Sequence, residues 1–225
     1  LIAPTGGGKT LAGFLPTLVE LSEEACGAAA QAKLVSTGRS IRRLIEMRFR
    51  DDEPITGTPT SVAILRTEDF DATNMALLVA RPALTLFLYR VDFNKTMRAA
   101  WSAVGLNDGR SHLALDLHYL ITAWANNAEN EHLILGRAMQ AIEDTPILTG
   151  PVLMQASDWA PSESLQLVLE DVDTESLMRI FDSLPVDYRL SVPYVARVTR
   201  IDGARPGPGQ RDPDVVTAVT GGRPR

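Results

Sequence analysis

The sequence predicts one α+β domain, in which helices flank a mixed or mostly antiparallel sheet. A helical N-terminal extension is expected before it and a flexible C-terminal tail after it. Two observations support this fold class. Segments with strand-like alternation of apolar and polar residues are interspersed with segments whose apolar residues recur every three or four positions. The chain has 225 residues, 45% of them hydrophobic, which is enough for a sizeable core.

The first fifth of the chain is predicted to be helical in two parts. The segment from Lys9 to about Ala32 is rich in Ala, Leu and Glu and is interrupted by Pro16 and Gly27. A second helix is then expected to begin with a hydroxyl N-cap. The candidates for that cap are Ser36, Thr37 and Ser40.

This second helix is expected to be amphipathic. The residues that recur at three and four positions are Ile41, Leu44, Ile45 and Arg48. The arginines that lie mostly on its other faces are Arg39, Arg42, Arg43, Arg48 and Arg50. They form either a solvated surface or an interface with an acidic partner.

Three segments then have the patterns of a loop and two strands. Residues 54–59 form a loop, and Ser61 to Arg66 is a short strand. The segment Ala83 to Phe93 is apolar on both faces, so a central strand covered on both sides is expected.

The segment Ser111 to Ala125 alternates, and one buried face is expected. Its apolar face would carry Leu113, Leu115, Leu117, Tyr119 and Ile121, and its other face His112, Asp116 and His118.

The chain after residue 129 is expected to contain two helices and two strands before its tail. Asn130 to Asp144 is an amphipathic helix, and its expected inner residues are Leu133, Gly136, Met139, Ala141 and Ile142. Leu165 to Leu169 is a strand, followed by a helix that Asp173 or Thr174 caps. The apolar residues of that helix are Leu177, Ile180, Phe181 and Leu184.

Tyr188 to Ile201 alternates as a strand but contains Pro193, which lacks a ladder donor. This strand is therefore expected at a sheet edge or with a bulge at the proline. From Asp202 the composition changes to Gly, Pro, Arg and Asp, as in a linker or mobile tail. Within this tail, Val215 to Val219 could pair with the sheet edge of a neighbour.

Composition excludes several classes of function. The net charge of −6 gives no general attraction to nucleic acid. The single cysteine, Cys26, cannot form an intrachain disulfide or a cysteine metal cluster. The apolar stretch from Met75 to Tyr89 is broken by Arg81 and Pro82, so no membrane span is expected, and no secretory signal is visible.

No catalytic or metal-binding constellation is found in the body of the chain. His112 and His118 share a strand face but would lie about 20 Å apart, too far for one metal ion, and His132 belongs to another element. The acids Glu170 and Asp171 follow an apolar strand in the reverse of the helicase order. They are interpreted as a solvated strand end.

The opening residues, Leu-Ile-Ala-Pro-Thr-Gly-Gly-Gly-Lys-Thr, resemble motif I of DEAD/DEAH-type helicases over about the first two dozen positions. The alternative function is therefore an ATP-dependent helicase fragment or a nucleotide-binding regulator. In that case Gly6, Gly8 and Lys9 would hold the phosphates and Thr10 the Mg²⁺. The expected companion, an apolar strand ending in Asp-Glu, is not found. Mg²⁺-dependent ATP binding that is lost in Lys9→Ala would favour this alternative.

The body of the chain resembles a different family, the N-terminal domain of the tube and sheath terminator, or cap protein, of phage-tail-like contractile injection systems. The likeness runs from about Thr37 to Ile201. The segments that carry it are Arg81 to Val91, Leu113 to Trp124, Glu131 to Ile142, Leu165 to Leu184 and Tyr188 to Ile201.

The resemblance implies a structural protein and not an enzyme, with no cofactor. It implies a homohexameric ring that binds the last layer of inner tube protein and sheath protein. The particle would assemble in the cytoplasm and could later be released from the cell. Neither a membrane nor a nucleic acid is expected as a partner.

Three regions are expected: a helicase motif I-like extension without ATPase function at 1–35, the terminator domain at 36–201, and the flexible tail at 202–225. The first region does not fit the family resemblance. We expect it to derive from an upstream reading frame, a fusion junction or a misplaced start.

Overall fold

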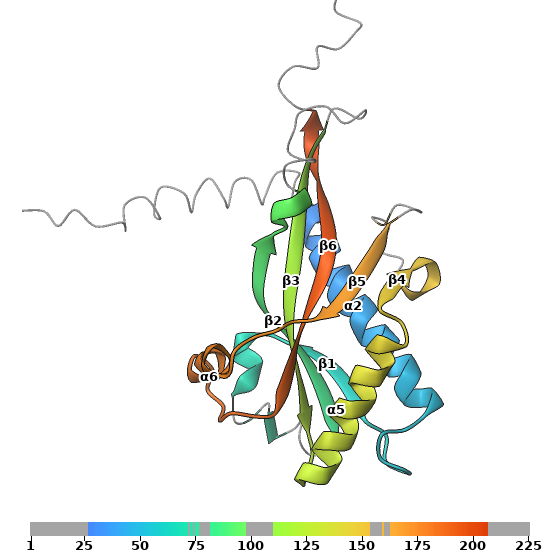
Figure 1. The fold of residues 1–225 in the computed structure, drawn as a ribbon, viewed down its shortest axis with the longest axis vertical. Helices are drawn as coiled ribbons and strands as arrows, with labels where there is room; N and C mark the ends of the chain where they lie inside the picture. Colours follow the sequence, from blue (N-terminus) through green and yellow to red (C-terminus); the bar gives the residue numbers. More distant parts are fainter. Residues whose placement is uncertain are drawn as a thin grey trace, which may run out of the picture.

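The structure is a computed structural model that describes residues 27–71, 73, 75–76, 82–97, 110–153, 159 and 163–206 (Figure 1). Its described strands form a six-stranded sheet in the order β1-β2-β3-β6-β5-β4. The strands are β1 (Ser61–Leu65), β2 (Ala83–Phe93), β3 (Arg110–Trp124), β4 (Ile147–Thr149), β5 (Ser164–Leu169) and β6 (Ser191–Pro206). The helices are α2 (Gly27–Asp51), α5 (Ala128–Glu143) and α6 (Thr174–Asp182), with short 3₁₀ turns η1 (Thr67–Phe70) and η2 (Gly150–Val152).

The sheet is mixed, as predicted. β1 pairs with β2 in parallel, and all other neighbouring strands are antiparallel. The long strands β3 and β6 lie at its centre, and their pairing shifts register between Leu115 and Leu117. The predicted α+β class with flanking helices is therefore confirmed. The parts of the predicted extension and tail at 1–26 and 207–225 lie outside the described residues.

Two hydrophobic cores cover the two faces of the sheet. The first core lies under α2 and α5, and its central residues include Ile45, Leu117 and Ile134. The second core lies under α6 and η1, and it includes Leu120 and Phe181. Because successive residues of a strand point to opposite faces, α2 and α6 lie on opposite sides of the sheet (Figure 1).

This arrangement corrects the expectation for β3. The sequence predicts one buried face, but Leu120 and Trp124 on the other face are also buried, and so are His112 and His118. The second core covers part of this face. Leu113, in contrast, belongs to the predicted buried face but is exposed. The alternation of residues in β3 could not show that its second face is buried, because the helix that covers Leu120 and Trp124 is α6, which begins 50 residues after the end of β3.

The start of α2 differs from the prediction. Ser36, Thr37 and Ser40 do not cap a helix, because α2 already begins at Gly27 and runs through them without a break. Their hydroxyls donate to carbonyl oxygens of the preceding turn. Thr37 donates to Lys33 at 2.8 Å and Ser40 to Ser36 at 2.7 Å. This hydrogen bond satisfies a buried hydroxyl within a helix. The predicted stripe of Ile41, Leu44 and Ile45 is confirmed, since all three are buried.

In α5 the predicted inner face is partly wrong. Ala141 and Ile142 are buried as expected, but Leu133 and Gly136 are exposed. The buried residues of this helix are Ile134, Leu135, Ala138, Ala141 and Ile142. Leu133, Ile134 and Leu135 are consecutive apolar residues, so their spacing alone does not select a face.

β2 has the predicted bounds, but it is buried on both faces only in its first half, where β1 pairs with Ala83 to Phe87. Its end, including Val91 and Phe93, is exposed.

The expectation of a sheet edge or a bulge at Pro193 is wrong. β6 lies inside the sheet between β3 and β5, and Pro193 pairs in regular register with Leu120. Pro193 is tolerated because β5 ends at Leu169, which pairs with Tyr194, so the proline has a strand neighbour only on the β3 side. β6 also continues to Pro206, past the predicted start of the tail at Asp202.

Candidate interaction surfaces

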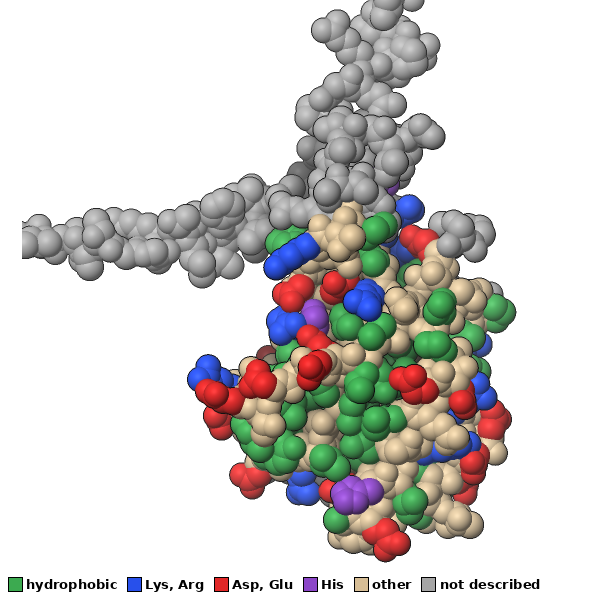
Figure 2. Space-filling model, in the orientation of Figure 1, with side chains coloured by type: hydrophobic (Ala, Val, Ile, Leu, Met, Phe, Trp, Pro, Cys, Tyr) green, Lys and Arg blue, Asp and Glu red, His purple; other side chains and the backbone are tan. Residues whose placement is uncertain are grey.

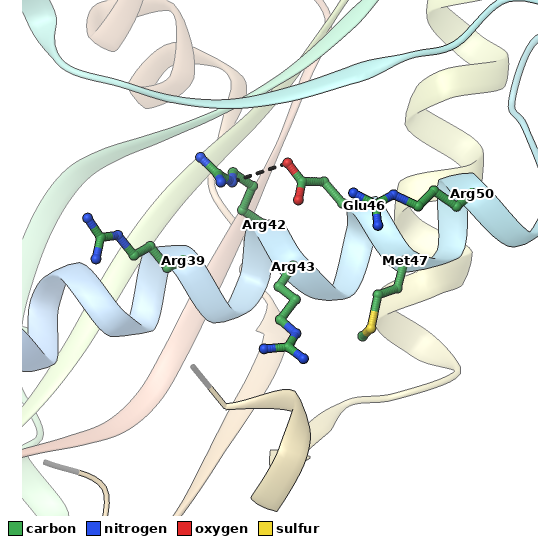
Figure 3. A pocket seen from close by; sticks show the side chains of 6 residues that line it. All are labelled: Arg39, Arg42, Arg43, Glu46, Met47 and Arg50. Atoms are coloured by element: carbon green, nitrogen blue, oxygen red, sulfur yellow. Dashed lines mark ion pairs between the residues drawn. The ribbon is translucent and has the colours of Figure 1, made fainter. Parts of the chain in front are cut away.

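The outward side of α2 carries a cluster of arginines. Because Ile41, Leu44 and Ile45 face the first core, the positions between them face solvent. We call the exposed residues Arg39, Arg42, Arg43 and Arg50 the arginine face. With Glu46 and Met47 they line a hollow of about 600 Å³. Figure 3 shows Arg43 and Met47 on one side of the helix and Arg42 and Glu46 on the other.

Local acids neutralise this face only in part. Residues 39–50 contain five arginines and one glutamate, Glu46. Arg42 pairs with Glu46 at 3.2 Å, one helical turn away. Arg48 turns inward and donates to the Thr145 hydroxyl at 3.0 Å. A solvated i,i+4 pair contributes only about 0.3–0.5 kcal/mol. Three acids, Asp51, Asp52 and Glu53, follow directly, so the excess of arginines is confined to residues 39–50.

Acidic residues gather on the opposite side of the sheet, around α6. We call the exposed residues Asp171, Asp173, Glu175, Asp182 and Asp187 the acidic face. Figure 2 shows acidic side chains at the left of the view, where α6 lies, with basic side chains among them. Asp173 caps α6. Its carboxylate accepts from the Ser176 hydroxyl at 2.7 Å and from the Ser176 N–H at 2.9 Å, and these two hydrogen bonds lower its pKa. Arg179, the one basic residue of α6, pairs with Glu175.

A polar cluster connects the acidic side to the sheet through Glu170. This carboxylate accepts hydrogen bonds from the Tyr89 hydroxyl at 2.8 Å and from Arg90 at 2.8 Å, and lies 2.7 Å from the His118 Nδ1. The other ring nitrogen of His118 lies 3.2 Å from Asp92. Glu170 is therefore not a solvated strand end as interpreted from the sequence, since three side chains from β2 and β3 hold it.

The electrostatics of this cluster favour an ionised Glu170. Burial would raise the pKa of this carboxyl, but hydrogen bonds from His118 and Tyr89 and the charges of His118 and Arg90 lower it below the ordinary 4.5. Burial, and then the hydrogen bond and charge of Glu170, raise the pKa of the Tyr89 hydroxyl. The cluster thus holds a carboxylate and a neutral phenol, a combination suited to cross-linking β2, β3 and the end of β5.

The histidines do not converge. His118 lies on the β3 face that carries the second core, whereas His132 is exposed on α5, which packs against the first core. In the part of the chain that the structure describes, no group of three or more His, Cys, Asp or Glu side chains is suited to a metal ion. Within those same residues, no helix is long and apolar enough to cross a membrane.

The nucleotide-binding candidates Gly6, Gly8, Lys9 and Thr10 lie outside the described residues, as do Cys26 and the segment Val215 to Val219.

The arginines of α2 could be identified as a surface from the sequence, but the acidic face could not. The signal was present, because residues 170–187 contain six acids and a single arginine. What the sequence could not give is the position of α6 across the sheet from α2.

Comparisons with known proteins found similar solved structures and a matching family model. No curated protein matches the sequence. A solved sheath/tube terminator of an extracellular contractile injection system, PVC, in its extended state, is 18% identical with a TM-score of 0.47. The match covers 83% of this chain and 63% of that one. The tube-terminating cap of the anti-feeding prophage is 19% identical with a TM-score of 0.45, over 72% of this chain and 55% of that one.

This chain thus spans less than two thirds of the length of either solved protein. The family model of the Pvc16 N-terminal domain matches residues 36–212, which include the whole described sheet and most of α2. The chain therefore belongs to the Pvc16 N-terminal domain family.

Proposed function

We propose that this chain is part of a structural terminator, or cap, of a phage-tail-like contractile injection particle. In this role it ends the inner tube and anchors the last layer of sheath. The observation that carries the proposal is the family match over residues 36–212, which spans most of the chain. The two solved proteins named as a tube/sheath terminator and a tube-terminating cap point to the same role.

The protein acts by binding and not by catalysis. Its described polar cluster at Glu170 is made of mutually satisfied side chains, whereas its exposed charges lie on two extended faces. Extended charged faces suit contacts between large rigid surfaces, because complementary potentials steer and orient the partners.

The partners in this proposal are further copies of the chain in a homohexameric ring, the inner tube protein and the sheath protein. A closed ring requires each copy to present two different surfaces, one to each neighbour. The particle is assembled in the cytoplasm and then leaves the cell with the cap in place.

Deleting the encoding gene in its native host tests the proposal. Electron microscopy of purified particles should show tubes or sheaths of uncontrolled length, or sheaths that contract or detach spontaneously. A plasmid copy of the full gene should restore uniform particles, which controls for effects on neighbouring genes. Deletion particles with unchanged length and stability would contradict the terminator role.

A further inference from the structure

We propose that the arginine face of one copy binds the acidic face of the next copy, so that the chain associates head to tail through α2 and α6. This inference rests on the proposed function, which requires contacts between copies, and it assigns the surfaces that make them.

The placement of the two faces fits such a contact. The arginine face belongs to α2 over the first core, and the acidic face surrounds α6 over the second core. The two therefore look away from opposite sides of one sheet, and a single copy cannot bring them together. A head-to-tail interface requires two different patches that do not meet within one copy. Each copy then binds one neighbour through the first patch and another neighbour through the second.

The chemistry of the two faces is complementary. The arginine face presents guanidinium groups, which bind carboxylates through two parallel hydrogen bonds. The acidic face supplies five exposed carboxylates within 17 residues. Each face also has a methionine among its charges: Met47 is half-buried on α2, and Met178 is exposed on α6. A flexible thioether can fill irregular gaps at the centre of a charged contact.

The overall charge favours a protein partner over a polyanion. The chain carries a net charge of −6, so the molecule as a whole gives nucleic acid or an anionic membrane no general attraction. Charges farther apart than the Debye length of about 8 Å are largely screened, so the local charges of the two surfaces in contact decide which partner binds. A second copy brings an acidic face of limited size, which meets the arginines while the remaining surfaces stay in solvent.

Charge reversal on each face separately, followed by mixing, tests the inference. The first variant of the full chain, Arg42→Glu/Arg43→Glu, has two negative side chains in the arginine face. The second, Asp171→Lys/Glu175→Lys, has two positive side chains in the acidic face. Sedimentation velocity over a range of concentrations should show that the wild-type chain associates and that each variant alone associates at least tenfold more weakly.

An equimolar mixture of the two variants should recover the association. In the mixture the two glutamates of one variant can oppose the two lysines of the other, and the unchanged faces also oppose each other, so opposite charges meet again at the substituted positions. Circular dichroism of each variant verifies that the fold is kept. Single charge reversals at exposed sites elsewhere, Lys95→Glu and Glu129→Lys, should leave association unchanged.

A mixture that associates no better than its separate variants would overturn this inference. Variants that associate as well as the wild type would also overturn it. If the arginine variant still associated but no longer held tube or sheath, the arginine face would bind that protein and not a second copy. The proposed function is judged independently, by the particles that the deletion strain makes.

Discussion

Glu170 shows how one side chain can connect three parts of the fold. It follows β5 in the sequence, yet its carboxylate is held by Tyr89 and Arg90 from β2 and by His118 from β3. Its side chain is 16% exposed, so these hydrogen bonds are shielded from competing water. Arg90 is more exposed, at 45%, and its charge is screened by solvent.

Replacing this carboxylate, in Glu170→Gln, should destabilise the protein by about 1 kcal/mol at pH 7, because hydrogen bonds to a charged group are stronger than neutral ones. The folded state lowers the pKa of Glu170. Its stabilising effect is therefore complete above the unfolded value, near 4.5, and is lost as the pH falls through the lower folded value. Urea unfolding at several pH values should show the two proteins converging in acid.

Asp171→Asn is the matched control, since Asp171 is the next residue and is exposed. It should change the free energy of unfolding little at any pH. A gap between wild type and Glu170→Gln that stays constant down to pH 3 would show that shape, and not charge, determines the role of Glu170.

At the scale of single residues, the sequence could identify chemistry but not partners. Asp173 was correctly one of two expected caps, because a cap bonds within its own helix turn. The helix cap predicted at Ser36 is wrong, because a serine hydroxyl can either cap a helix or donate to a carbonyl oxygen inside one, as Ser36 does to Lys33. The partners of Glu170 lie 52 to 81 positions away along the chain, and no local pattern encodes such contacts.

At the scale of elements, the helix α2 lies close to the sheet at Gly38. A Cβ atom added there would lie 3.2 Å from the Tyr119 hydroxyl and 3.3 Å from a methyl group of Ile64. Gly136, in the other helix on this side, has open space at the same position. The two glycines thus have the same helical backbone but different surroundings.

Substitution by alanine should separate these two effects. Gly136→Ala should stabilise the protein by up to about 1 kcal/mol, the difference in helix propensity. Gly38→Ala gains the same propensity but has to push Tyr119 or Ile64 away, so it should be at least about 1 kcal/mol less stable than Gly136→Ala. Thermal and urea unfolding measure both. Equal gains at the two sites would mean that α2 can shift away from the sheet without cost.

Elements with strong patterns were predictable, and their neighbours were not. The strand predicted from Ala83 to Phe93 has the bounds of β2. This strand was predictable because its first residues are apolar on both faces. β6 was misplaced to an edge because a proline argues against an interior strand. The structure resolves this conflict through the length of β5, which ends before it reaches Pro193. That length is a property of the neighbour and cannot be read from β6 itself.

At the scale of the whole molecule, the sheet is a layer shared by two cores. β2 and β3 contribute Leu84 and Leu117 to the first core and Phe87 and Leu120 to the second. Neither core can lose its strands while the other remains intact. The opposed arginine and acidic faces are thus mounted on one rigid layer, which fixes the angle between the two contacts of each copy.

Because the two cores share strands, a destabilising substitution in one core should also lower the stability of the other. Phe181→Ala, which truncates a side chain of α6 that is 4% exposed, should cost about 3–5 kcal/mol. If the domain unfolds in one transition, hydrogen exchange near the unfolding midpoint should lose protection to the same extent in α5, on the far side of the sheet, as in β3. Leu133→Ala on the exposed side of α5 is the control and should change protection little. A loss confined to α6 and the segments around it would show instead that the second core opens separately, and the acidic face would then not be rigidly coupled to the arginine face.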